Sequence, residues 1–96
     1  MMLRWLVKPQ AKYRRSPRAS WKRIEDSVVV LDDVEGELIR FNGVGDRIWE
    51  ELDGRRSVSD LAKLLGAEFD APAGVLEKDI ASFLRRLADM ELVEKA

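Results

Sequence analysis

The sequence of 96 residues contains no cysteine and no histidine, and it has only three prolines. Without thiols and imidazoles the chain cannot form disulfides, thiolate nucleophiles, the usual zinc sites or histidine-based acid–base pairs. Long hydrophobic runs are missing too. Arg4 interrupts the apolar stretch at residues 1–7, and a membrane span needs about 20 apolar residues. We therefore expect a cytoplasmic binding module with no enzymatic activity, no metal, no cofactor and no membrane segment.

Acidic residues are also missing from the first 23 positions, which carry eight lysines and arginines. Since the whole chain has 17 basic and 18 acidic groups, the remaining residues hold nine basic against 18 acidic groups. Pro9 and Pro17, set among polar spacers, make residues 8–20 read as an irregular tether. We therefore divide the chain into a basic, partly irregular N-terminal arm at residues 1–20 and a domain at residues 21–96.

The basic arm has three interpretations that the sequence leaves open. It packs on its own acidic domain, it binds an acidic partner or nucleic acid, or it acts as an import-type presequence. Residues 2–7 read as a short strand or a sticky tip, and Trp5 within them is a candidate for pairing with the edge strand of a neighbouring copy. A homodimer through the arm is a further alternative.

Three short β-branched runs follow the arm and predict strands at residues 21–24, 27–31 and 37–41. Turn-forming residues separate them, and Gly36 lies just before the third run. In that third strand Ile39 and Phe41 lie on one face, while Arg40 points to the other. Arg40 is either a charge that discourages edge-to-edge association or a partner for an acidic ligand residue.

From residue 44 the hydrophobic period changes from 2 to 3.6, which predicts three helices. The first runs from Val44 to about residue 52 and ends at Gly54; its Trp49 is expected in the core. The second begins after Ser57, with Asp60 completing a capping box. The third runs from about residue 73 to residue 90. Strands followed by helices with short connections favour a compact α+β domain with a three-stranded antiparallel sheet followed by three helices.

An ordered set of residues carries a family resemblance. Its members are Val28–Leu31, Gly36, Phe41-Asn42, Val44-Gly45, Ile48-Trp49, Leu52-Asp53-Gly54, Val58, Leu61, Asp79-Ile80, Phe83-Leu84, Leu87 and Leu92-Val93. This set resembles the PqqD family, which comprises small winged-helix-like modules that recognise peptides during the biosynthesis of ribosomally made, modified peptides, coenzyme PQQ included. The resemblance covers roughly residues 15–93 and leaves out the arm. The segment at 41–45 departs from members dedicated to PQQ, so the peptide that this chain serves stays open.

The resemblance implies a winged-helix-like, non-catalytic module that binds the leader of a precursor peptide as an extra β-strand on the third strand, against the third helix. Such modules present the leader to a modifying enzyme, commonly a radical SAM protein. Main-chain hydrogen bonds give affinity in this mode and side-chain pockets give specificity. Carried over to this chain, the candidate peptide-binding residues are Glu37, Leu38, Ile39, Arg40, Phe41, Asp79, Ser82, Phe83, Arg85 and Arg86.

The sequence does not say which flank of the third helix faces the strand. At about 100° per residue, Arg86 shares one flank with Asp79 and Ser82, whereas Arg85 lies further round the helix. Both arginines therefore remain candidates at this stage.

The alternative function is that of a winged-helix DNA-binding regulator, because residues 57–93 also read as a helix–turn–helix pair. Two observations weigh against it. The start of the third helix would bring Glu77, Lys78 and Asp79, with a net charge of −1, to a polyanion. Only three residues follow Val93, which leaves no room for a wing. We therefore expect no specific nucleic-acid partner.

Overall fold

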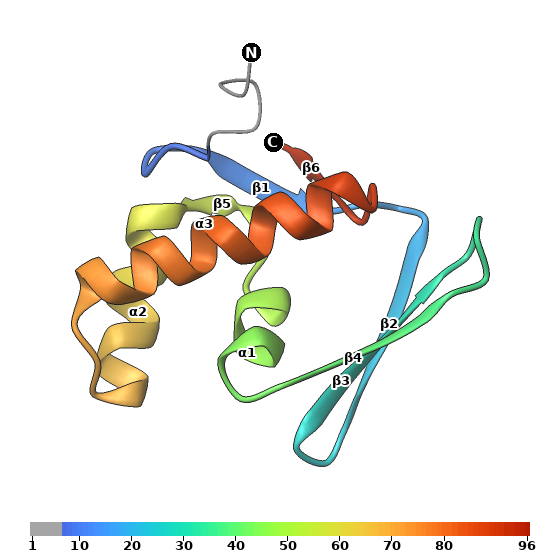
Figure 1. Cartoon of the computed structure of the whole chain (residues 1–96), viewed down its shortest axis with the longest axis horizontal. Coiled ribbons are helices and arrows are strands. Elements are labelled where there is room, and N and C mark those ends of the chain that lie inside the picture. The colour runs from blue at the N-terminus through green and yellow to red at the C-terminus, as the bar shows by residue number, and fades with distance from the viewer. Residues whose placement is uncertain (1–6) are drawn as a thin grey trace.

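The computed structural model describes residues 7–96, which form six strands and three helices (Figure 1). The strands are β1 (Lys12–Arg15), β2 (Ala19–Ile24), β3 (Ser27–Asp32), β4 (Leu38–Asn42), β5 (Asp53–Ser57) and β6 (Val93–Lys95). The helices are α1 (Val44–Glu50), α2 (Val58–Phe69) and α3 (Ala73–Asp89). Within these residues no helix is both long enough and apolar enough to cross a bilayer.

The strands form two antiparallel sheets of three strands, in the orders β2-β3-β4 and β5-β1-β6. The first sheet consists of the three predicted strands, so the predicted α+β class with an antiparallel sheet and three helices is confirmed. In Figure 1, α3 crosses the molecule between the second sheet and α1, and β2-β3-β4 projects to one side. The second sheet is an addition that the sequence pattern did not indicate.

The basic arm is where the structure differs most from the sequence prediction. Residues 12–15 form β1, the central strand of the second sheet, and β2 already begins at residue 19, so the interpretation of residues 8–20 as an irregular tether is wrong. The hydrogen-bonding partners of β1 come from β5 and β6, and Tyr13 is the side chain that β1 buries, with 8% of its surface exposed. The boundary at residue 20 therefore falls inside β2. The strand expected at residues 2–7 and the tip at Trp5 lie largely outside the described residues.

Two arginines of the arm form ion pairs with the chain's own acidic groups. Arg14 pairs with Glu94 at 2.8 Å, and Arg18 pairs with Asp32 at 3.0 Å. Of the three interpretations of the arm, packing on its own acidic domain is the one that these contacts bear out. Because β1 is paired on both sides within its own chain, a homodimer through this strand would have to break one of those pairings.

Helix boundaries follow the predicted signals except at the end of α1. The capping box of α2 is present: the Ser57 hydroxyl accepts from the Asp60 N–H at 3.1 Å, and the Asp60 carboxylate accepts from the Ser57 N–H at 3.2 Å. Helix α1 ends at residue 50, and Gly54 lies in β5 instead of capping the helix. Gly54 has φ +85°, and a Cβ there would lie 3.0 Å from Ala96, so the second sheet requires this glycine.

The core lies among the three helices and the inner faces of the two sheets. Val28 and Val30 of β3 are fully buried, as is Trp49 of α1 in agreement with the prediction. The predicted apolar stripe of α3 is also buried; its members are Leu76, Ile80, Phe83, Leu84 and Leu87.

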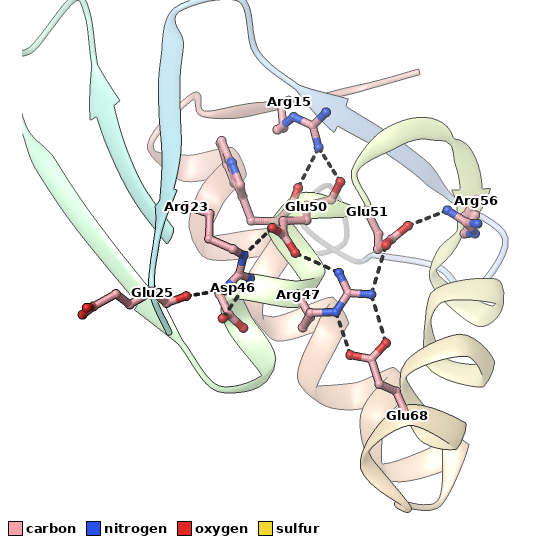
Figure 2. Close-up of polar contacts among 10 residues, drawn as sticks. Arg15, Arg23, Glu25, Asp46, Arg47, Glu50, Glu51, Arg56 and Glu68 are labelled. Atoms are coloured by element: carbon pink, nitrogen blue, oxygen red, sulfur yellow. Dashed lines mark hydrogen bonds and ion pairs between the residues drawn. The ribbon is translucent and has the colours of Figure 1, made fainter. Parts of the chain in front are cut away.

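A network of ion pairs holds α1 against both β2 and α2 (Figure 2). Arg23 of β2 donates to the carboxylates of Asp46 and Glu50, and Arg47 donates to Glu50, Glu51 and Glu68. The hydrogen bond from Arg23 lowers the pKa of Glu50, and the hydrogen bond from Arg47 lowers the pKa of Glu68. A helix of seven residues is too short to be stable alone. These contacts therefore help to fix α1 beside β4.

Candidate functional site

Strand β4 is an edge strand, because β3 is its only partner among the described residues. Ile39 pairs with Val30 and Phe41 pairs with Val28, so both side chains face the core and are half-buried. The side chains of Leu38, Arg40 and Asn42 are exposed.

The hairpin that leads into β4 determines which residues of β4 form main-chain hydrogen bonds with β3. The N–H of Asp32 donates to the carbonyl of Glu37 at 2.8 Å, and the N–H of Gly36, with φ +76°, donates to the Asp32 carbonyl at 2.7 Å. This is a bulge of the kind that requires glycine at its first position. Hydrogen-bonded pairs alternate along an antiparallel ladder. Ile39 and Phe41 therefore bond to β3, and the main-chain groups of Leu38, Arg40 and Asn42 point to the free edge.

The start of β4 is held by Asp32, which is 2% exposed. Its carboxylate accepts two hydrogen bonds from the Arg18 guanidinium, each at 3.0 Å, and one each from the N–H groups of Val34 and Glu35. The bonds from Arg18 lower the pKa of the Asp32 carboxyl, and the two backbone donors act in the same direction. Asp32 therefore stays ionised near neutral pH and fixes the hairpin.

Two hollows of about 410 and 350 Å³ lie between β4 and α3. The first is lined by Arg40, Phe41, Asn42, Val44, Gly45, Ile48, Asp79, Ser82, Phe83 and Arg86. The second is lined by Ile39, Arg40, Phe41, Phe83, Arg86, Leu87 and Met90. The hollows share four residues, so they form one continuous trough, which we call the β4–α3 groove. The rings of Phe41 and Phe83 meet edge to face at 5.0 Å between centroids and form its apolar floor.

Seven of the ten predicted site residues line this groove: Ile39, Arg40, Phe41, Asp79, Ser82, Phe83 and Arg86. Glu37 lies before β4, with its carbonyl engaged in the hairpin. Leu38 is 70% exposed on the outer face of the sheet, beside Leu31 and Ile24. Arg85 lies on the other flank of α3, in a hollow with Tyr13 and Val93, because one residue turns a helix by about 100°. The structure thus brings Arg86, and not Arg85, to the groove.

Six lining residues were not predicted, namely Asn42, Val44, Gly45, Ile48, Leu87 and Met90. A Cβ at Gly45 would lie 3.4 Å from the ring of Phe83 and 3.6 Å from Cβ of Phe41. Gly45 therefore lets the start of α1 approach the groove floor closely. The helical phase of Val44 and Ile48 was visible in the sequence, but it could not say that this face of α1 closes one end of the groove.

Residues 7–96 bring together no group of three or more acidic, histidine or cysteine side chains that could hold a metal ion.

The family model described as "Coenzyme PQQ synthesis protein D (PqqD)" matches residues 27–93. Two curated relatives are named PqqA binding protein. The protein from Acinetobacter baylyi is 34% identical over 74 residues, which covers 77% of this chain and 72% of the relative. The protein from Gluconobacter oxydans is 28% identical over 81 residues, which covers 84% of this chain and 82% of the relative.

Three solved structures share the fold. One is TbiB1 in complex with the TbiA(beta) leader peptide, with a TM-score of 0.78, 31% identity, and coverage of 84% of this chain and 94% of that one. The second is lasso peptide synthetase B1 complexed with the leader peptide, with a TM-score of 0.77, 26% identity, and coverage of 88% and 99%. The third is the PqqD truncation of Methylobacterium extorquens PqqCD, described as a stand-alone recognition element. It has a TM-score of 0.80 at 22% identity, covers 97% and 99% of the two chains, and is evidence for the fold alone.

Proposed function

This chain belongs to the PqqD family, and we propose that it is a non-catalytic module that binds the leader of a ribosomally made precursor peptide by strand addition to β4. The observation that carries the proposal is the free edge of β4, which lies directly beside the β4–α3 groove. The names of the curated relatives, which are PqqA binding proteins, and the two similar structures that contain leader peptides support it.

The docked peptide adds a fourth strand to β2-β3-β4. Because the sheet is antiparallel throughout and antiparallel pairing is slightly the more stable, the peptide runs antiparallel to β4. Its main chain bonds to Leu38, Arg40 and Asn42, and every second side chain enters the groove. Strand β4 has five residues, which span about 17 Å at about 3.4 Å per residue, so a segment of five to seven peptide residues is bound.

The chemistry on the peptide belongs to a partner enzyme, which we propose to be a radical SAM protein or another peptide-modifying enzyme. The chain has no cysteine or histidine, and the groove is lined by apolar, amide, hydroxyl and arginine side chains around the single carboxylate of Asp79. Such a lining is typical of a binding surface. We place the encounter in the cytoplasm, where ribosomes release the precursor.

The direct test is a nuclear magnetic resonance titration of the isotope-labelled protein with the leader segment of the precursor encoded beside its gene, and with PqqA as a comparison. The amides at 38–42 and along 79–90 should shift in a saturable manner, while a scrambled leader of the same composition should cause no such change. Saturable shifts confined to the β5-β1-β6 sheet would move the site and refute docking on β4.

A further inference from the structure

Arg86 of α3 borders the β4–α3 groove and has no neutralising partner within residues 7–96. Arg14, Arg18, Arg23, Arg47 and Arg56 form ion pairs, and Arg15 donates to the carbonyls of Trp49 and Glu50. Within residues 7–96, four arginine side chains have neither an ion pair nor a hydrogen bond: Arg40, Arg55, Arg85 and Arg86. Two of these four, Arg40 and Arg86, border the groove. Arg40 pairs with Val29 on the face of the sheet opposite to Ile39 and Phe41, so the arginine side chain that faces the groove interior is that of Arg86.

Arg86 lines both hollows, so it lies where the hollows meet. The floor beside it is apolar, made by the rings of Phe41 and Phe83. Charges act more strongly beside an apolar, partly dehydrated surface than in open water. The one carboxylate of the lining, Asp79, lies seven residues before Arg86, about 10 Å away along the axis of α3. The middle of the groove is therefore positive, and its Asp79 end is negative.

The order of these features along a bound strand follows from the direction of the two walls. Asp79 shares the first hollow with Asn42, and Met90 shares the second hollow with Ile39, so α3 runs opposite to β4. A peptide antiparallel to β4 then enters at Asp79, passes Arg86 and leaves at Met90. The second hollow is lined, apart from the arginines, by Ile39, Phe41, Phe83, Leu87 and Met90. Side chains two positions apart on one face of a strand are about 6.7 Å apart.

Resting on the proposed function, we propose that Arg86 selects leaders with an aspartate or glutamate at the position whose side chain faces it in the groove. A large aliphatic or aromatic residue follows two positions later and fills the second hollow. An acidic residue at the Asp79 end is disfavoured by like-charge repulsion. Hydrogen bonds to ionised groups are about twice as strong as neutral ones and, from arginine, directional. Arg86 therefore sets the register of the leader as well as contributing to its affinity.

The test uses a phage-displayed library of random ten-residue peptides, selected separately on the wild-type protein, on Arg86→Glu and on Arg85→Glu. The wild-type pool should be enriched in an acidic residue two positions before a large apolar one. In the Arg86→Glu pool lysine or arginine should replace the acid, with the apolar position unchanged. Arg85→Glu, which carries the same charge change on the other flank of α3, should select as the wild type does.

The wild-type consensus peptide and its acid-to-lysine variant are then synthesised, and their dissociation constants are measured by fluorescence anisotropy. The lysine peptide should bind the wild type about tenfold more weakly and should regain affinity for Arg86→Glu. Selection by charge would be overturned if the enriched peptides had no acidic position, or if the acidic preference survived in Arg86→Glu. Either result would leave strand addition intact. If the wild-type protein enriches no peptide at all, the proposed function fails and this inference fails with it.

Discussion

The direction of the main-chain groups along β4 can be tested with proline, which removes one N–H at a chosen position. The N–H of Arg40 points to the free edge, whereas the N–H of Ile39 bonds to Val30 within the sheet. Proline is tolerated on an edge strand where its missing N–H would face solvent. Arg40→Pro should therefore leave the domain folded and remove one bond to the peptide, while Ile39→Pro should damage the sheet itself.

The expected size of the effect follows from the bonds that each variant loses. One main-chain hydrogen bond contributes about 1 kcal/mol, so Arg40→Pro should weaken leader binding by about fivefold relative to Arg40→Ala, which carries the side-chain loss alone. Ile39→Pro leaves the Val30 carbonyl without its donor inside the sheet, which costs about 1–3 kcal/mol of folding stability. For a domain of this size each kcal/mol lowers the melting temperature by about 4–8 °C.

The assay pairs calorimetric titration with the leader and thermal unfolding followed by circular dichroism, for the wild type and the three variants. Arg40→Pro should melt close to Arg40→Ala but bind more weakly, and Ile39→Pro should show the larger loss of melting temperature. The reasoning would be refuted if Arg40→Pro and Arg40→Ala bound the leader equally well while both were folded, because the Arg40 N–H would then take no part in docking.

Three further predictions concern the groove, the hairpin and the second sheet. Gly45→Val should narrow the first hollow, since the added atoms would meet Phe83 and Phe41, and leader affinity should fall about tenfold or more with α-helical content retained; full affinity would show that the peptide avoids this end. The pKa of Asp32 is lowered in the folded state, so its stabilising effect is complete above its unfolded pKa of about 3.9 and is lost as the pH falls below that value. Melting temperatures between pH 6 and pH 3 should therefore fall less for Asp32→Asn than for the wild type, and parallel curves would contradict this. Tyr13→Ala should cost about 3 kcal/mol in chemical denaturation because it empties a buried site under α3, while Lys12→Ala on the exposed side of β1 should be nearly neutral; equal effects would mean that β1 does not pack as described.

Local signals in the sequence predicted the elements whose stabilising contacts are local. The capping box of Ser57 and Asp60 spans three residues, and the β2-β3-β4 strands are joined by short turns, so both were predictable. Strand β1 was not, because its partners lie far away in the chain: Arg14 bonds to Glu94, 80 residues later. Its four residues include three positive charges and one buried tyrosine, which gives too little alternation to indicate a strand.

The sequence could predict which strand and which helix form the groove, but not which of their side chains line it. The family resemblance placed it between residues 37–41 and the third helix. Which arginine faces the strand depends on the rotation of α3 about its axis, which the packing of its buried stripe sets and the sequence leaves open. The hydrogen-bond phase of β4 depends in turn on the bulge at Gly36, since moving the bulge by one residue would exchange the bonded and the free positions.

The pairing of β1 with β6 also determines how the domain responds to mechanical force. Lys12 and Ala96 meet at the same end of this ladder, where the Ala96 N–H donates to the Lys12 carbonyl. Tension applied to the two ends of the chain would therefore peel the pairing apart one bond at a time, which needs far less force than shearing all the bonds at once. The β2-β3-β4 sheet lies between β1 and β6 along the chain. It would therefore carry little load until β1 has separated from β6. A pull on a domain or tag attached at either end would thus open the second sheet before it disturbed the free edge of β4.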